Sequence, residues 1–146
     1  MQALGKPGIE RRHQVIGLVA LALFAPQIGE ALQVCVVEGE GRLHELVNPR
    51  IVRSTGDDRD LEGCLSLPGY YAYVTRREHV WIVAQNRVGK KIKVSGHGFL
   101  ARALQHELDH LNGRLFLDYL GVTLAGAVEE STVVLRRGLA NLCRTL

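Results

Sequence analysis

The chain has 146 residues, of which 47% are apolar and 23% are charged, and its net charge is +3. This length is typical of one domain with a sizeable core, so we predict that residues 1–146 fold as a single unit. The small net charge and the 5% aromatic content exclude a strongly basic nucleic-acid-binding protein, and there is no direct nucleic-acid motif.

Two features bear on the compartment of the protein. Residues 1–24 are an atypical N-terminal segment, in which Arg11–His13 and the apolar run Val15–Ala25 resemble parts of a signal peptide. This run is shorter than the about 20 apolar residues of a membrane-spanning helix, so we expect no membrane segment. Three cysteines at irregular spacings do not suggest a disulfide framework. They favour a reducing compartment, either the bacterial cytoplasm or an organelle.

Residues 31–95 have the pattern of β-strands. Apolar and β-branched residues recur there in short runs that turn-forming residues separate. The clearest runs are Leu32–Val37, Leu46–Val52, Val80–Ala84 and Lys91–Val94. The last two flank Asn86–Gly89, whose Asn and Gly favour a hairpin turn. We therefore predict an antiparallel meander.

Beyond these strands the apolar period becomes helical. Leucines at 100, 104, 108 and 111 predict a helix over 98–112 with one apolar face, and Gly113 can cap its end. A second helical stretch, roughly Ala125–Leu142, carries another apolar stripe. Strands followed by helices predict an α+β fold, with antiparallel strands around a central helix and with a C-terminal helix.

The helix over 98–112 contains a His-Glu-x-x-His motif. His106 and His110 are one turn apart on the same face, so two imidazole nitrogens can reach one metal ion. Glu107 projects about 60° around the axis from His110, which suits a general base that approaches water without binding the ion. A divalent ion lowers the pKa of the water it binds from about 16 to roughly 7, so a carboxylate can take its proton at neutral pH.

The helical motif alone leaves the third protein ligand open. Metzincin proteases have a histidine at the position of Phe116, and phenylalanine cannot coordinate a metal. Gluzincin proteases use a glutamate about twenty residues downstream, where Glu129 and Glu130 lie, although two acids also suit the first turn of a solvated helix. Cys64 is the strongest alternative, because a glycine before it and a Pro-Gly pair after it indicate a rigid loop or a strand end.

Other polar residues could brace such a site. Asp109 and Gln105 flank the histidines, and a carboxylate beside an imidazole N–H fixes its tautomer and orientation. Arg102 lies one turn before His106, and we predict that it pairs with Glu62 and braces the cysteine loop. Exposure of both residues on the surface is the alternative.

Two motifs together closely resemble those of the peptide deformylase family. They are Glu-Gly-Cys-Leu-Ser at 62–66 and His-Glu-Leu-Asp-His at 106–110, within a similarity that runs from about Ala25 to Asp118. The resemblance implies a metallohydrolase with a metal-binding helix cradled by antiparallel strands. It implies removal of the formyl group from N-terminal formylmethionine of newly made polypeptides. The formylated nascent polypeptide is then the expected partner, with the ribosome as a second one.

The resemblance also implies the roles of individual residues. One divalent ion would be held by three ligands: Cys64, His106 and His110. Fe2+ is the metal of the family, with Zn2+, Ni2+ or Co2+ as replacements, and this set of donors would suit zinc equally. Glu107 would act as the general base and then as the general acid. The Gln27 side-chain amide and the backbone N–H of Leu65 would stabilise the oxyanion.

The first family motif departs from its usual form. The family pattern reads Gly-x-Gly-x-Ala-Ala-x-Gln, whereas Ala20–Gln27 lacks both glycines and one alanine. Added methyl groups and the ring of Phe24 could narrow the pocket beside the substrate. A catalytically weakened deformylase-like protein is therefore one alternative. A zinc peptidase of the His-Glu-x-x-His type that uses Glu130 and a non-enzymatic protein with a structural metal are the others.

Overall fold

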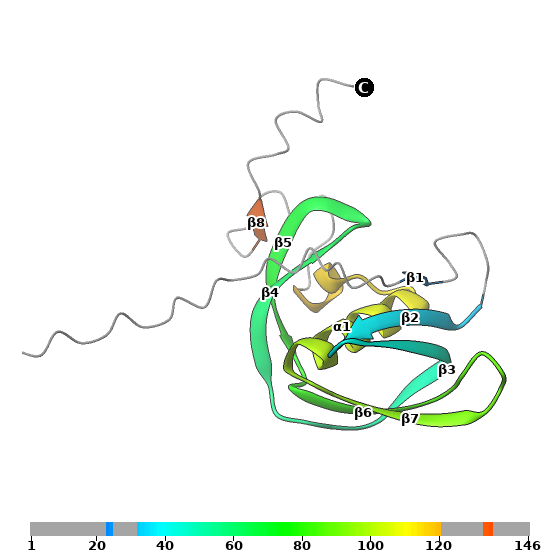
Figure 1. Ribbon diagram of the computed structural model, residues 1–146. Coiled ribbons are helices and arrows are strands. Elements are labelled where there is room, and N and C mark those ends of the chain that lie inside the picture. The colour runs from blue at the N-terminus through cyan, green and yellow to red at the C-terminus, as the bar shows by residue number, and fades with distance from the viewer. Residues whose placement is uncertain (1–22, 25–31, 121–132, 136–146) are drawn as a thin grey trace, which may run out of the picture.

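The computed structural model describes residues 23–24, 32–120 and 133–135, and it has the α+β fold that the sequence predicts (Figure 1). The described residues form these strands: β1 (Leu23–Phe24), β2 (Val34–Gly39), β3 (Arg42–Thr55), β4 (Asp58–Cys64), β5 (Leu67–Arg76), β6 (His79–Gln85), β7 (Lys91–His97) and β8 (Val133–Leu135). They also form the α-helix α1 (Gly98–Leu111) and the 3-10 helix η2 (Phe116–Leu120).

The strands make two antiparallel sheets. One has the order β1-β2-β3-β6-β7, and the other has the order β4-β5-β8. In Figure 1 the larger sheet curves around α1, while β4 and β5 rise beside it. The predicted antiparallel pairing is confirmed for β2, β3, β6 and β7, but the meander is interrupted, because β4 and β5 lie between β3 and β6 in the chain and belong to the other sheet. The predicted hairpin between β6 and β7 is present, and Asn86 Oδ1 accepts hydrogen bonds there from the N–H groups of Val88 and Lys90.

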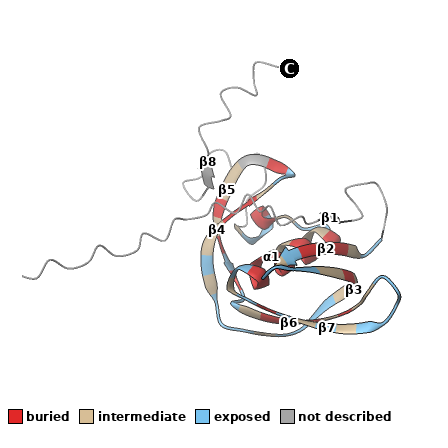
Figure 2. Ribbon diagram, in the orientation of Figure 1, coloured by how far each residue is buried: buried red, intermediate tan, exposed pale blue. Residues whose placement is uncertain are grey.

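The leucine face of α1 packs on the larger sheet, as the helical period predicts. Its four leucines are buried together with apolar residues of β2, β3 and β6: Leu100, Leu104, Leu108, Leu111, Cys35, Val37, Leu46, Val80, Ile82 and Ala84. Figure 2 shows buried residues along α1 and along the strands beside it. A second, smaller cluster joins β5 and η2 through Leu67, Ala72, Val74, Phe116 and Leu117, with Cys64 packed against it.

The prediction of a C-terminal helix over Ala125–Leu142 is wrong at Val133–Leu135. These residues form β8, which pairs antiparallel with β5. Two successive valines favour an extended backbone, and β5 offers an edge with backbone groups that need partners. A helical period of apolar residues therefore does not decide the conformation here. The remainder of the predicted helix lies outside the described residues.

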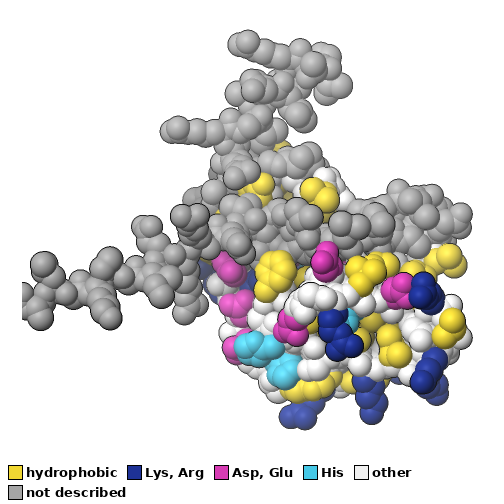
Figure 3. Space-filling view, viewed as in Figure 1, with side chains coloured by type: hydrophobic (Ala, Val, Ile, Leu, Met, Phe, Trp, Pro, Cys, Tyr) yellow, Lys and Arg dark blue, Asp and Glu magenta, His cyan; other side chains and the backbone are white. Residues whose placement is uncertain are grey.

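The Lys and Arg side chains lie mainly on the solvated surface. Figure 3 shows several of them along the side of the molecule where β6 and β7 run. Lys91 and Lys93 of β7 are exposed, and so are Arg50 and Arg53 of β3. Within the described part of the chain, none of the helices has the length and apolar character that a membrane span needs.

Gly96 allows α1 to lie close against β7. A Cβ atom at this position would lie 2.7 Å from Leu104 Cδ1 and 3.1 Å from the backbone nitrogen of Ala101. We expect Gly96→Ala to lower the free energy of unfolding by about 1–3 kcal/mol, because the helix must move. Urea unfolding measures the change. Lys93→Ala, at an exposed position of the same strand, should change it by less than about 0.5 kcal/mol. Equal values for the two variants would contradict the close approach.

Candidate metal centre

Three potential metal ligands converge where α1 meets the end of β4. His106 and His110 come from successive turns of α1, and Cys64 is the last residue of β4. Their ligand atoms all lie within 4.8 Å of one another. Cys64 Sγ is 3.2 Å from His110 Nε2, which is 3.0 Å from His106 Nε2. Tetrahedral zinc with ordinary bond lengths holds neighbouring ligand atoms about 3.5 Å apart, so the three residues fit one divalent ion.

The ladder between β4 and β5 is irregular at Cys64. The pairing of β4 with β5 shifts register between Gly63 and Cys64, so Gly63 lies opposite Tyr71 whereas Cys64 lies opposite Leu67. At Gly63 a Cβ atom would lie 2.7 Å from ring carbons of Tyr71, so the two strands approach this closely only because the residue is glycine. The glycine before the cysteine therefore has a steric cause. Of the two places that the sequence predicts for Cys64, a rigid loop or a strand end, the structure has the strand end.

Glu62 holds the ring of His106, and sequence reasoning did not assign it this role. Glu62 Oε1 lies 2.7 Å from His106 Nδ1. Because a carboxylate can only accept, Nδ1–H donates to Glu62, and Nε2 is left to face Cys64 and His110. A signal was present in the sequence, since Glu62 and Cys64 are two residues apart on one strand and so project from the same face.

Buried arginines fix Glu62 in turn. Arg76 donates to both of its carboxylate oxygens, from Nη2 over 2.6 Å and from Nε over 3.0 Å. Arg102 Nη1 donates to Glu62 Oε2 over 3.0 Å, so the predicted ion pair is confirmed. Arg102 also donates to Val74 O and to Asp58. All three members of this cluster are at most 3% exposed, so an ordered and dry scaffold stands behind the metal site.

The other two predicted bracing residues have different partners. The Gln105 amide pairs with both backbone groups of Arg77, accepting from N–H over 3.0 Å and donating to C=O over 2.8 Å. It therefore ties α1 to the chain after β5 and does not hold an imidazole. Asp109 accepts hydrogen bonds from Arg76 and Tyr119. Among the described residues, its hydrogen bonds lead to His106 through Arg76 and Glu62.

The electrostatics of the site favour a thiolate. Burial alone would raise the pKa of Cys64, but hydrogen bonds and positive charge from His106 and His110 lower it to about 5. Burial would lower the pKa of His106, whereas its hydrogen bonds to Cys64 and Glu62 raise it to about 10. Without a metal ion, the proton thus resides on the imidazole. A divalent cation would displace it, since metal ligands bind in their deprotonated forms.

Glu107 lies beside the two histidines in a buried position. It is 4% exposed, and its Oε2 has no hydrogen-bond partner among the described residues. Burial raises its pKa, and the positive charges of His106 and His110 oppose that rise. A carboxyl group with a raised pKa and an unused buried oxygen is suited to exchange a proton with water or substrate at this site.

The structure describes one of the two predicted oxyanion donors, Leu65. Leu65 forms the turn directly after Cys64, with its side chain exposed, so its backbone N–H adjoins the thiolate in the chain. Gln27 lies outside the described residues. Of the altered first motif, the structure describes only Leu23–Phe24, which pairs with β2.

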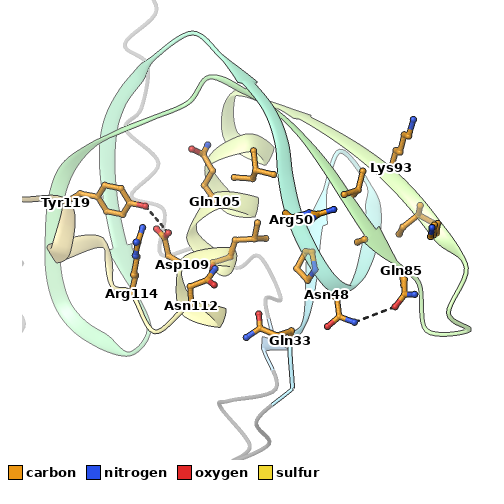
Figure 4. A pocket seen from close by; sticks show the side chains of 17 residues that line it. Gln33, Asn48, Arg50, Gln85, Lys93, Gln105, Asp109, Asn112, Arg114 and Tyr119 are labelled. Atoms are coloured by element: carbon orange, nitrogen blue, oxygen red, sulfur yellow. Dashed lines mark hydrogen bonds between the residues drawn. The ribbon is translucent and has the colours of Figure 1, made fainter.

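A cavity of about 1060 Å³ lies on another side of α1 (Figure 4). Helix α1 contributes Gln105, Leu108 and Asp109 to its wall, and the remaining lining residues come largely from β3, β6 and β7. None of the three potential metal ligands lines it. The cavity is therefore separate from the candidate metal centre, and we assign the chemistry to the cluster of ligands.

Comparison with known proteins gives consistent matches. The family model described as polypeptide deformylase matches residues 10–123. The peptide deformylase of Halothermothrix orenii is 46% identical over 112 residues, which are 75% of this chain and 71% of that protein. The peptide deformylase of Carboxydothermus hydrogenoformans is 48% identical over 99 residues, which are 67% of this chain and 64% of that protein.

Solved structures agree with these sequence matches. The crystal structure of a peptide deformylase from Legionella pneumophila has a TM-score of 0.68 to this chain at 40% identity, and the match covers 84% of this chain and 70% of that one. The peptide deformylase from Thermus thermophilus has a TM-score of 0.64 at 39% identity, with 67% and 60% covered. The chain thus spans about two thirds of the length of these relatives.

Proposed function

Because this chain belongs to the polypeptide deformylase family, we propose that it hydrolyses the formyl group from N-terminal formylmethionine of newly made polypeptides. The observation that carries the proposal is the convergence of the ligand atoms of Cys64, His106 and His110. Beside them lies Glu107, whose Oε2 has no hydrogen-bond partner in the described part of the chain. Family membership alone would leave open whether this chain retains the chemical groups that such a reaction needs.

The proposed cofactor is one divalent ion held by Cys64, His106 and His110. We propose Fe2+, with Zn2+, Ni2+ or Co2+ able to replace it, since a thiolate and two imidazoles accept all of these ions. When bound, such an ion lowers the pKa of water and polarises a carbonyl oxygen. The Nδ1 contact of His106 to Glu62 would keep that ligand in the correct tautomer throughout.

The residues of the chain would manage the protons of the reaction. Glu107 would take a proton from the attacking water as the water oxygen bonds to the formyl carbon. It would then give that proton to the amine nitrogen as the C–N bond breaks, so formate and a free amino terminus leave. The backbone N–H of Leu65 and the amide of Gln27 would stabilise the oxyanion between these steps, and losing one such donor typically costs about 100- to 1000-fold in rate.

The proposed partner is the formylated nascent polypeptide, with the ribosome as the place where the two meet. This requires a compartment in which translation starts with formylmethionine, and we propose the bacterial cytoplasm or an organelle. The named relatives in our comparison are bacterial, which supports the first of these.

Formate release tests the function directly. Protein loaded with Fe2+ under anaerobic conditions is incubated with a formyl-Met tripeptide, and formate is quantified. We expect release that depends on the metal and stops after chelation. Metal-loaded protein that releases no formate would contradict the activity, and the non-enzymatic alternative would then stand. Cleavage of internal peptide bonds in an unformylated peptide would instead favour the zinc peptidase, whose ligand Glu130 lies outside the described residues.

A further inference from the structure

A chain of polar contacts leads from the surface of η2 to the metal site. Tyr119 Oη donates to Asp109 Oδ1 over 2.8 Å, and Asp109 Oδ2 accepts from Arg76 Nη1. Arg76 donates to both oxygens of Glu62. Glu62 then accepts from His106 Nδ1 over 2.7 Å. Each of these residues contacts the next, so the exposed tyrosine is linked to a proposed metal ligand through three intervening side chains.

Arg76 and Glu62, the two inner members of this series of contacts, are almost completely buried. Arg76 is 3% exposed and Glu62 is 1% exposed, whereas Tyr119 is 48% exposed. A buried group whose only partners are protein atoms takes its orientation from them, and removing a partner leaves a polar atom that water cannot satisfy. The orientation of Arg76 therefore depends on Asp109 as well as on Glu62.

Tyr119 closes the outer end of this arrangement. Its ring lies over the Arg76 guanidinium, whose carbon is 4.4 Å from the ring centroid. The ring thus shields the ion pair of Arg76 and Asp109 from solvent, while its hydroxyl directs one oxygen of Asp109. Both contacts act on the same two residues. Figure 4 shows the tyrosine pointing at Asp109 from η2.

The same series of hydrogen bonds joins β4 and α1, the two elements that carry the potential metal ligands. Glu62 belongs to β4, which ends in Cys64, and Asp109 belongs to α1, which carries both histidines. Arg76, at the end of β5, bonds to both at once. The spacing between the cysteine and the histidines is therefore set partly by one buried guanidinium.

We propose that Tyr119 is a positioning residue for the metal centre, which acts through Asp109, Arg76 and Glu62 to fix the His106 ring and the spacing between α1 and β4. The inference rests on the proposed metal site, and it extends that site to a residue on the surface of η2. Removal of the hydroxyl alone should loosen metal binding although no ligand is altered.

Tyr119→Phe tests this, because it keeps the ring over Arg76 and removes only the hydroxyl, which donates to Asp109. The matched control is Tyr73→Phe. Tyr73 also lies beneath an arginine, with Arg59 5.0 Å from its ring centroid, but no described contact links it to the ligands. Co2+ affinity is measured by competition with a chelator, and the visible absorption bands of the Co2+ protein report ligand geometry.

We expect Tyr119→Phe to weaken Co2+ binding about tenfold and to shift the absorption bands, with Tyr73→Phe unchanged in both. Asp109→Asn should have at least as large an effect. The double variant with Tyr119→Phe should lose less than the sum of the two single losses, since both act along one route.

Three results would overturn the inference. Tyr119→Phe with the Co2+ affinity and bands of the wild type would overturn it alone, while formate release by the wild type kept the proposed function intact. A lowered melting temperature of the metal-free variant with unchanged Co2+ bands would show a purely structural role. Wild-type protein that binds no divalent ion would overturn the proposed function and the inference together.

Discussion

Glu107→Gln is expected to lower the rate of formate release by about 100- to 10,000-fold while metal binding persists. The amide has nearly the shape of the carboxyl group, but it cannot take a proton from water and pass it to the departing amine. The native carboxyl is buried, and its Oε2 has no hydrogen-bond partner among the described residues. The substitution therefore breaks no described hydrogen bond of this oxygen. The measurement is kcat/KM with a formyl-Met tripeptide, beside Co2+ affinity.

A matched control separates this effect from a general one. Glu78→Gln alters an exposed glutamate whose described ion-pair partner is His97, and it should leave the rate unchanged. If Glu107→Gln kept the rate within tenfold of the wild type, another group would have to carry the proton. If it lost metal binding together with activity, Glu107 would be a ligand and not the acid/base.

Glu62→Gln is expected to lower the free energy of unfolding by about 3–5 kcal/mol and to weaken metal binding about 10- to 100-fold. It removes the negative charge shared by Arg76 and Arg102, both buried, and weakens the acceptor for His106 Nδ1. Urea unfolding of the metal-free protein gives the first value, and chelator competition gives the second.

The free energy of unfolding depends on pH through Glu62, because the pKa of this carboxyl is lowered in the folded protein. Burial would raise its pKa, but hydrogen bonds from His106 and Arg76 lower it from 4.5 to about 2. A lowered folded-state pKa means that its stabilising contribution is fully present above about pH 4.5 and is lost as the pH falls through about 2. Unfolding at pH 7 therefore reports the whole effect.

An exposed ion pair provides the control for Glu62. Asp57 pairs with Arg77 over 2.6 Å, and both side chains are at least half exposed. Asp57→Asn should change the free energy of unfolding by less than about 1 kcal/mol. A similar small change for Glu62→Gln would show that the buried arginines do not need this carboxylate.

Local periodicity was sufficient to predict the parts of the site that lie on one helix. The spacing of the leucines gives the buried face of α1, and the spacing of His106 and His110 places both rings together. Cys64 needed more than spacing, because it comes from another strand. Its glycine neighbour and the resemblance to a family pointed to it, and the structure brings it to the two histidines.

What sequence reasoning missed depends on contacts between distant segments. Arg76 is 14 residues from Glu62 and 33 from Asp109, so no local pattern reveals that it bonds to both. Asp109 looked like a partner for an imidazole because it is adjacent to His110, yet its side chain turns to Arg76 and Tyr119. The strand at Val133–Leu135 was missed for a similar reason, since pairing with β5 overrides a helical period.

The metal site lies at the junction of two hydrophobic cores. His106 and His110 belong to the helix that packs on the larger sheet, while Cys64 packs against the smaller cluster of β5 and η2. An ion bound there would connect the two cores. Metal binding would then stabilise the folded chain. Each tenfold rise of free ion above its dissociation constant then adds about 1.4 kcal/mol to the stability of the folded chain. The amount of folded protein in a cell would consequently follow the supply of metal.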